Sequence, residues 1–397
     1  MKSAREQYDY ITRTLDVTLP EGELLARLGE ERPLRVKLGV DPTAPDVTLG
    51  WAVVFDLLRR FQEMGHVAVL IVGDFTAQVG DPSERKETRK RLDAGEVDAY
   101  ASRCLPIIRE LLSAENLEIR PNSDWLAAMD MKAVLELTSK VTVARVMDRD
   151  DFTKRWAANE PISLIEFMYP LLQAMDSVAV GADVELGGAD QLWNLLIGRE
   201  IQERYGQRPQ TVVTVPLLVG TDGQRKMSQS YGNYISVTDP ADQMFGKAMS
   251  IPDDVMPEWY LLAAGADPAE VDTLRGALTE GSVHPGTAKR ELGRRIVARY
   301  HGPDAAGAAE DAFDRLFVAR EAPDEVREYP LAAGDPVWLP AVLASADLVS
   351  SNSEGRRMIA QGAVRVEGER VSDEQIARAE VAGKVVQVGK RRFARLV

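Results

Sequence analysis

Three polar side chains share one face of an otherwise apolar segment in the middle of the sequence. Tyr169, Gln173 and Asp176 are spaced i, i+4 and i+7, so on a helix they point in one direction. A phenol, an amide and a carboxylate on one face could hold a zwitterionic amino acid. A solvent-exposed face is the alternative, but the flanking residues are strongly apolar, and buried polar groups are costly without partners. The pattern therefore favours a binding site.

Two polar loops follow segments that are typical of buried strands. The segment 72–83 contains Asp81, a candidate for holding an ammonium group. The segment 39–51 leaves a strand, passes through a proline-rich turn and enters a helix near Gly50, where a flat ring or a phosphate could approach the backbone. An ordinary strand-to-helix connection explains this second segment more simply. The basic run 85–91 is either a solvated face or, beside a cleft, a region that attracts phosphates.

Two glycine-bearing loops could contact a nucleotide. Asp190 follows Gly187 and Gly188 and is placed to bind a hydroxylated ligand such as ribose, although a structural turn explains this segment equally well. Residues 220–230 form a glycine-flanked cationic loop around Arg225 and Lys226, of the kind that clamps phosphates.

Strands and helices alternate around these residues in the segment 1–235. We expect strands at 35–40, 66–72, 117–120 and 211–216, and a helix at 51–64 that ends at Gly65. This alternation predicts an α/β fold with a doubly wound parallel sheet. We expect a helical domain at 236–319, a linker rich in Glu, Pro and Asp at 320–336, and a small domain of short helices and strands at 337–397.

Composition is typical of a globular protein of the cytoplasm. The single cysteine, Cys104, excludes an internal disulfide and fits a reducing compartment, and the longest apolar runs are far short of a membrane span. The formal net charge is −14, yet residues 337–397 hold ten Lys and Arg against seven Asp and Glu. This basic end is either a docking surface for a polyanion or simply a solvated surface.

Taken together, in their order and spacing, these segments resemble the bacterial tyrosyl-tRNA synthetases. The segments 37–39 and 44–46 are similar to the subgroup that has a lysine in that strand. The segment 42–51 resembles the region of the first class I signature, HIGH, and Lys226-Met227-Ser228-Gln229-Ser230 resembles the second, KMSKS. The segment 352–364 resembles an S4 RNA-binding module. The resemblance covers essentially all 397 residues.

The resemblance implies a Rossmann-like catalytic domain, a helical anticodon-binding domain, a C-terminal S4 module and a homodimer. It also implies two-step chemistry, in which tyrosine attacks the α-phosphate of ATP and the tyrosyl group then passes to the 3′ end of tRNA. ATP would bring Mg²⁺ with it, and the protein itself would bind no metal. A cytoplasmic enzyme without a membrane partner is expected.

Site residues follow from the matched motifs. Asp81, Tyr169 and Gln173 would hold the amino group of tyrosine, and Asp176 would accept from its phenolic hydroxyl. The implied tyrosine-binding set is Lys37, Gly39, Asp41, Asp81, Tyr169, Gln173, Asp176 and Gln191. The implied ATP-binding set, with Gly50 under adenine and Asp190 at ribose, is Gly50, Gly188, Asp190, Lys226, Met227 and Ser228. The implied tRNA-binding residues are Arg356, Arg357 and Arg365.

The catalytic positions of the two signatures are Thr48, Trp51, Lys226 and Gln229. Thr48 and Trp51 stand where the first signature has histidines, and Gln229 stands where the second has a lysine. Near the phenol pocket, Met175 replaces an aromatic hydroxyl of the subgroup, and Ile165 replaces a histidine.

Two hypotheses follow from these replacements. The first is a tyrosine–tRNA ligase that works at reduced rate or with remodelled phosphate contacts. The second is a diverged paralogue that binds tRNA without adenylating, or that activates a different amino acid. The retained amino-acid contacts favour the first, because buried polar groups are costly in a protein without a ligand. A nicotinamide-dependent oxidoreductase is disfavoured, since no G-x-G-x-x-G opens the first helix.

Overall fold

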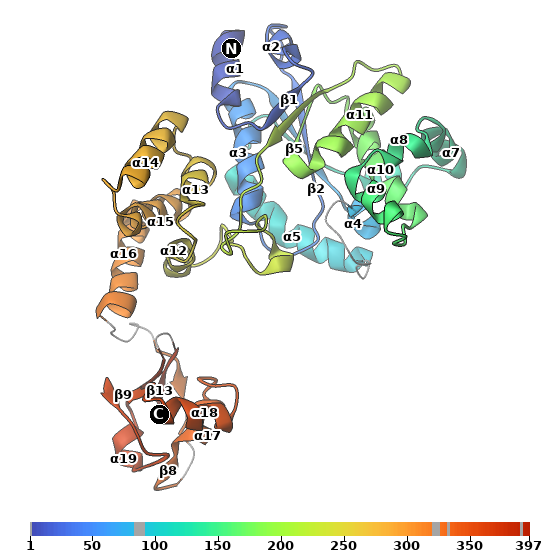
Figure 1. The fold of residues 1–397 in the computed structure, drawn as a ribbon. Helices are drawn as coiled ribbons and strands as arrows, with labels where there is room; N and C mark the ends of the chain where they lie inside the picture. Colours follow the sequence, from blue (N-terminus) through green and yellow to red (C-terminus); the bar gives the residue numbers. More distant parts are fainter. Residues whose placement is uncertain (1, 83–91, 320–325, 332–333, 390–391) are drawn as a thin grey trace. The chain divides into compact units, whose positions relative to one another are not determined.

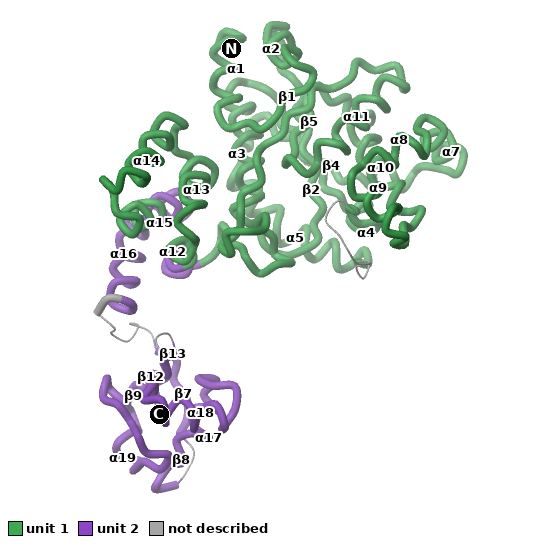
Figure 2. The backbone as a smooth tube through the Cα atoms, in the orientation of Figure 1, with its two compact units in different colours: residues 1–239, 247–292 green, residues 240–246, 293–397 purple. Residues whose placement is uncertain are grey.

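The computed structural model describes residues 2–82, 92–319, 326–331, 334–389 and 392–397. The chain forms two compact units, residues 1–239 with 247–292 and residues 240–246 with 293–397 (Figure 2). The division runs inside helices α12 (Ala241–Met249) and α15 (Pro285–His301). The domain boundaries expected near 235 and 319 therefore stay predictions.

A six-stranded sheet forms the centre of the first unit (Figure 1). Its order is β1 (Val17–Leu19), β6 (Thr211–Val215), β5 (Val184–Gly188), β2 (Arg35–Val40), β3 (Val67–Val72) and β4 (Leu117–Pro121). The five strands β6 to β4 are parallel, and β1 adds to the edge in antiparallel orientation. The predicted parallel sheet is confirmed, and each of the four expected strands lies within one residue of its observed bounds.

The direction of strand addition reverses between β2 and β5. From β2 the chain crosses through α3 (Leu49–Glu63) to β3, whereas from β5 it crosses through α11 (Leu192–Arg204) to β6 on the other side. Right-handed crossovers in opposite directions place the two helices on opposite faces of the sheet. Ligands of doubly wound sheets bind at the carboxyl ends of the strands at such a reversal. The fold thus predicts a site at the ends of β2 and β5.

The other helices of the first 239 residues cover the sheet or extend from it. They are α1 (Ala4–Thr12), α2 (Glu23–Leu28), α4 (Thr76–Val79), α5 (Ala94–Leu111), α6 (Ser123–Leu126), α7 (Met131–Ser139), α8 (Val143–Met147), α9 (Asp150–Ala157) and α10 (Leu164–Val180). Short 3-10 helices lie at Ala189–Gln191 and Gln229–Tyr231.

A helical segment follows, as the sequence predicted. Besides α12 and α15 it contains α13 (Met256–Leu262), α14 (Pro268–Glu280) and α16 (Pro303–Asp314), and a π-helical turn at Arg315–Ala319 continues α16. None of the helices that the structure describes is long and apolar enough to cross a membrane.

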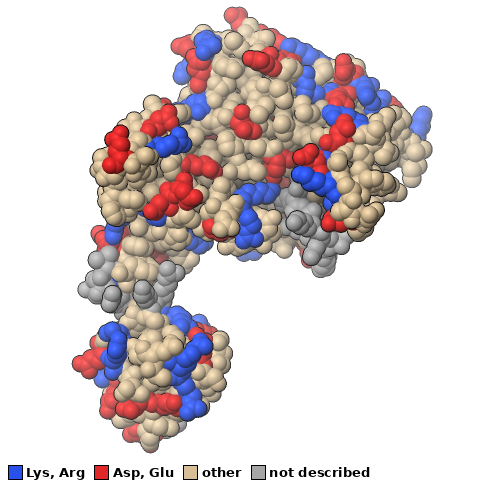
Figure 3. All heavy atoms as spheres, viewed as in Figure 1, with Lys and Arg blue, Asp and Glu red and all other residues tan. Residues whose placement is uncertain are grey.

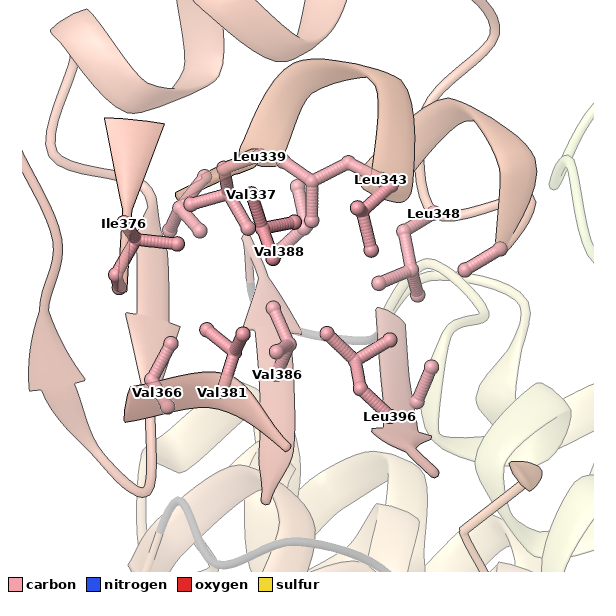
Figure 4. Packing of buried hydrophobic residues seen from close by; sticks show 14 of the residues in the cluster. Val337, Leu339, Leu343, Leu348, Val366, Ile376, Val381, Val386, Val388 and Leu396 are labelled. Atoms are coloured by element: carbon pink, nitrogen blue, oxygen red, sulfur yellow. The ribbon is translucent and has the colours of Figure 1, made fainter. Parts of the chain in front are cut away.

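The C-terminal part has a hydrophobic core of its own, drawn in Figure 4. A five-stranded sheet, ordered β10 (Glu369–Arg370), β9 (Val364–Val366), β12 (Val385–Val388), β13 (Arg392–Leu396) and β7 (Glu328–Tyr329), packs with α17 (Leu339–Ser345) and α18 (Asn352–Ala360). The pair β8 (Val337–Trp338) and β11 (Gln375–Ile376) and helix α19 (Arg378–Val381) complete it. Strand β7 lies inside the expected linker 320–336, part of which is outside the described residues.

Candidate active site

A cavity of about 280 Å³ lies where the carboxyl ends of β2 and β5 diverge. All five segments selected from the sequence contribute to its walls. The structure brings together every expected tyrosine-binding and ATP-binding residue except Lys37: the lining includes Gly39, Asp41, Thr48, Gly50, Trp51, Asp81, Tyr169, Gln173, Asp176, Gly188, Asp190, Gln191, Lys226, Met227, Ser228 and Gln229. The basic run 85–91 lies outside the described residues.

The half-buried carboxylate of Asp41 holds the phenol of Tyr169 at the end of β2. The Tyr169 hydroxyl donates to Asp41 Oδ2 at 2.9 Å, and the Thr76 hydroxyl donates to Asp41 Oδ1 at 2.7 Å. Burial raises the pKa of Asp41 to about 7. Gly73 makes room for this carboxylate, because a Cβ there would lie 1.9 Å from Asp41 Oδ1. The hydroxyl of Tyr169 therefore has a fixed orientation, with lone pairs free to accept from a ligand.

Asp176 lines the cavity two helical turns after Tyr169 on α10 and is 3% exposed. The indole Nε1 of Trp125 donates to its Oδ1 at 2.9 Å, and Asn122 Nδ2 donates to its Oδ2 at 3.3 Å. Burial raises the pKa of Asp176 to about 7, although the nearby Lys37 ammonium and the two donors oppose the shift. Sequence reasoning missed Trp125 and Asn122. Their position just after β4 could have identified them, because parallel strands end at the same edge of a sheet, where the site lies.

Lys37 lies behind the cavity rather than in its wall. The side chain is fully buried, and its ammonium group pairs with Glu185 Oε1 at 2.8 Å. It also donates to Ser177 Oγ at 2.8 Å and to the carbonyl oxygen of Gln173 at 2.9 Å. The ion pair therefore links β2 to β5, and the two hydrogen bonds link β2 to α10. A direct contact of Lys37 with tyrosine stays a prediction.

Gln173 lines the cavity and has a buried acceptor without a partner. Its Nε2 donates to Glu185 Oε1 at 3.2 Å, whereas its Oε1 is buried and has no hydrogen-bond partner among the described residues. Nearby, Gln191 Nε2 donates to Asp81 Oδ2 at 2.8 Å, which links the loop after β3 to the turn after β5. A buried unpaired oxygen is unfavourable unless a ligand satisfies it. An ammonium group fits this position.

The nucleotide side of the cavity contains a preformed ion pair. Lys226 Nζ lies 2.5 Å from Asp190 Oδ2, so the expected phosphate contact and the expected ribose contact neutralise each other. Gly50 lies close under this loop, because a Cβ at Gly50 would be 3.4 Å from the Cβ of Met227. A ligand that uses Asp190 or Lys226 must separate them.

The replaced signature residues have structural partners. Thr48, 2% exposed, caps α3 by accepting from the Trp51 backbone N–H at 3.2 Å. The Trp51 ring meets Phe55 edge-on, with ring centroids 6.5 Å apart. Gln229 Nε2 donates to the Asp46 carbonyl oxygen at 2.7 Å. Thr48 and Gln229 thus shape the loops.

Met175 does not line the cavity, contrary to the expectation for the phenol pocket. It packs instead against the cluster of Leu137, Leu171, Ala174, Ile197 and Ile201. The reason is helical geometry: Met175 is adjacent to Asp176 in sequence, so it points about 100° away from it around α10.

In the C-terminal unit the three expected RNA-binding arginines are placed separately. Arg356 and Arg357 are exposed on α18, and Arg356 Nε lies 2.8 Å from Glu374. Arg365 on β9 donates to the Gly368 carbonyl oxygen at 2.9 Å. Within the described part of the chain, no group of three His, Cys, Asp or Glu residues is arranged to hold a metal ion.

A polar cavity beside a cationic loop, at the reversal point of a doubly wound sheet, is typical of the nucleotide-dependent enzymes as a class. Comparison with known families gives the particular one. Residues 29–318 match the family model "tRNA synthetases class I (W and Y)", and residues 337–375 match the S4 domain. The chain belongs to this family of class I tRNA synthetases.

Curated relatives match over almost the full length. A tyrosine–tRNA ligase of Geobacter sulfurreducens is 49% identical over 99% of both chains. One of Moorella thermoacetica is 45% identical over 98% of this chain and 95% of its own. Among solved structures, the tyrosyl-tRNA synthetase of Archaeoglobus fulgidus in complex with L-tyrosine has a TM-score of 0.63 and 22% identity, and covers 78% of this chain and 99% of its own. That last likeness concerns the fold alone.

Proposed function

We propose that the protein is a tyrosine–tRNA ligase, which activates tyrosine with ATP and transfers the tyrosyl group to tRNA. The observation that carries the proposal is Asp176: a buried carboxylate, held by Trp125 and Asn122, lines the inner wall of an amino-acid pocket. A phenol can donate a third hydrogen bond to Asp176, whereas a phenyl ring has no donor and places an apolar edge against a buried carboxylate. The full-length relatives named as tyrosine–tRNA ligases support the same substrate.

The opposite end of the amino acid meets three acceptors. Asp81, Tyr169 and Gln173 all line the cavity, and their oxygens suit a primary ammonium group. The tyrosine carboxylate is then free to attack. Its oxygen bonds to the α-phosphorus of ATP while the bond to the pyrophosphate oxygen breaks, so no protein nucleophile is required. Positioning and electrostatic stabilisation supply the rate.

ATP would bind as its Mg²⁺ complex across the loop 217–230. Asp190 would hold the ribose, adenine would lie over Gly50, and Lys226 would turn from Asp190 to the departing pyrophosphate. Each missing charge donor typically costs about 10²–10³ in rate. With Thr48 and Gln229 engaged by the backbone, we expect slower activation than the signature residues would give.

A second candidate is a paralogue that binds tRNA without adenylating. The observation that favours it is the pairing of Lys226 with Asp190, which occupies both nucleotide contacts. The unpaired Gln173 Oε1 and the retained tyrosine pocket argue against it, because they have a cost and no use without an amino acid.

The proposal includes tRNA and a second copy of the chain as partners, and a cytoplasmic location. The S4 match supports RNA binding at α18. For the second copy, the support is an apolar patch of Met131, Leu135, Val143, Trp156 and Leu164, each 62–81% exposed. On the face drawn in Figure 3, the surface over α7 to α10 carries few charged side chains. A patch of this kind marks an interface.

Charging of tRNA tests the proposal. Purified protein, ATP, Mg²⁺, labelled tyrosine and bacterial tRNA should give acid-stable labelled tyrosyl-tRNA. The variant Arg357→Ala should charge more slowly at limiting tRNA, with tyrosine activation unchanged, because it removes one phosphate contact. Binding of tRNA without any charging would sink the ligase proposal and leave the second candidate.

A further inference from the structure

Two loops border the nucleotide side of the cavity, and backbone hydrogen bonds join the residues where each loop ends. The Leu49 N–H donates to the Ile235 carbonyl, and the Val237 N–H donates to the Val47 carbonyl, both at 2.9 Å. An antiparallel bridge between Thr48 and Ser236 lies between these bonds. The end of the loop 41–48 is therefore fixed to the chain that follows the loop 218–233.

The loop 218–233 is ordered internally by Asn233. Its Oδ1 accepts from the Ser228 N–H at 2.9 Å, and its Nδ2 donates to the Lys226 carbonyl at 3.1 Å. Gly220 leaves room for this amide, because a Cβ there would lie 2.2 Å from Asn233 Nδ2. At the start of the loop, Trp259 Nε1 donates to the Val219 carbonyl at 3.0 Å. These bonds hold the loop together internally, and its segment Gln229–Tyr231 needs a separate attachment to the neighbouring loop.

Gln229 supplies that attachment. Its Nε2 donates to the Asp46 carbonyl at 2.7 Å, and its Oε1 accepts from the Asp46 N–H at 3.2 Å. Tyr234 donates to the side chain of the same Asp46, to Oδ2 at 2.8 Å. A carboxamide can satisfy a backbone N–H and C=O together, whereas a lysine ammonium has donors only. The replacement of a signature lysine by glutamine therefore fits a neighbouring backbone rather than a phosphate.

We propose that Gln229 is a positioning residue that docks the loop 218–233 onto Asp46 before a nucleotide binds. Docking fixes Lys226, Met227 and Ser228 against the wall formed by Gly50. The loop is then ordered before ATP binds, so the binding free energy of ATP is not reduced by the cost of ordering it. Gln229 acts on ATP affinity through the loop, and contacts no phosphate itself. The kinetic part of this inference rests on the proposed ligase function, whereas the docking part does not.

Hydrogen exchange tests the docking directly. Gln229→Met keeps the length and packing of the side chain and removes both hydrogen bonds. The matched control is Gln224→Met, in the same loop but exposed. In the full-length protein without ligand, we expect Gln229→Met to raise the exchange rate of the Asp46 amide and of residues 220–233 about tenfold, the loss of two ordinary hydrogen bonds. The control should leave both rates unchanged. Unchanged exchange in Gln229→Met would overturn the docking.

Kinetics then separate positioning from phosphate contact. In tyrosine-dependent pyrophosphate exchange, Gln229→Met should raise KM for ATP about tenfold and leave kcat within about twofold. A fall in kcat with KM for ATP unchanged would contradict the inference and assign Gln229 to the transition state. If wild-type protein shows no exchange with any amino acid, the ligase proposal fails, and the hydrogen-exchange result still decides whether Gln229 docks the loop.

Discussion

The half-buried carboxylate of Asp41 and the buried carboxylate of Asp176 determine how the tyrosine pocket responds to pH. Each has a pKa raised to about 7, first of all by burial. A phenol donates a stronger hydrogen bond to an ionised carboxylate than to a carboxylic acid, so the tighter-binding form dominates above pH 7 and is lost as the pH falls below it.

We therefore expect kcat/KM for tyrosine to fall about tenfold between pH 8 and pH 6. The measurement is tyrosine-dependent exchange at saturating ATP. Far-ultraviolet circular dichroism at both pH values is the control for the fold. A flat profile across this range would mean that neither carboxylate gains a proton there, and would refute the assigned role of burial.

For single residues, the sequence predicted the site correctly where all the residues of a pattern lie on one helix. Tyr169, Gln173 and Asp176 lie on one helix, so their spacing alone predicted that they converge. The sequence did not identify the partner of Lys37, Glu185, which is 148 residues away. A lysine in an apolar strand gives the same pattern whether it faces a cavity or a buried carboxylate. Only the register of β2 beside β5 distinguishes the two.

Among the elements, a buried histidine connects α1, β2 and β3. The Leu34 N–H donates to His66 Nδ1 at 3.1 Å, so Nε2 carries the proton and donates to Gln7 Oε1 at 2.9 Å. Burial lowers the pKa of His66 to about 4. The folded state keeps this imidazole neutral, whereas the unfolded chain protonates it below about pH 6.5. Its stabilising contribution is therefore present above pH 6.5 and lost as the pH falls toward 4.

We expect His66→Asn to remove this dependence. Between pH 7 and pH 4.5, the difference in free energy of unfolding between wild type and variant should shrink by about 2–3 kcal/mol. Urea unfolding at the two pH values measures it. His284→Asn, at an exposed position, is the matched control for loss of an imidazole. A difference that is the same at both pH values would show that His66 is not held neutral.

Elements with a strong local signal were predictable, and those that depend on distant partners were not. The apolar run 67–72 and Gly65 before it marked β3 and the end of α3. By contrast, β1 is three residues long, and its pairing with β6 joins Val17 to Thr214. Strand β5 ends at Gly187 and Gly188, and in the sequence this glycine pair indicated a turn rather than the end of a strand.

For the molecule as a whole, the apolar patch predicts a second copy. Trp156→Glu places a charge where the side chain is 71% exposed in one chain, so monomer folding should be preserved. In a symmetric dimer the same charge would meet its own copy near the two-fold axis. We expect sedimentation velocity to show a dimer for wild type and a monomer for Trp156→Glu.

The control for this experiment is Val397→Glu, which adds the same charge at another exposed apolar residue. It should remain a dimer. A wild-type monomer at micromolar concentration would remove the patch as a self-association surface.

The central claim is that this chain adenylates tyrosine. The most direct measurement is exchange of labelled pyrophosphate into ATP by the full-length protein, run separately with each of the twenty amino acids. We predict exchange with tyrosine and none above background with phenylalanine, because phenylalanine has no hydroxyl to donate to Asp176. Exchange with another amino acid instead, or with none, would contradict the claim.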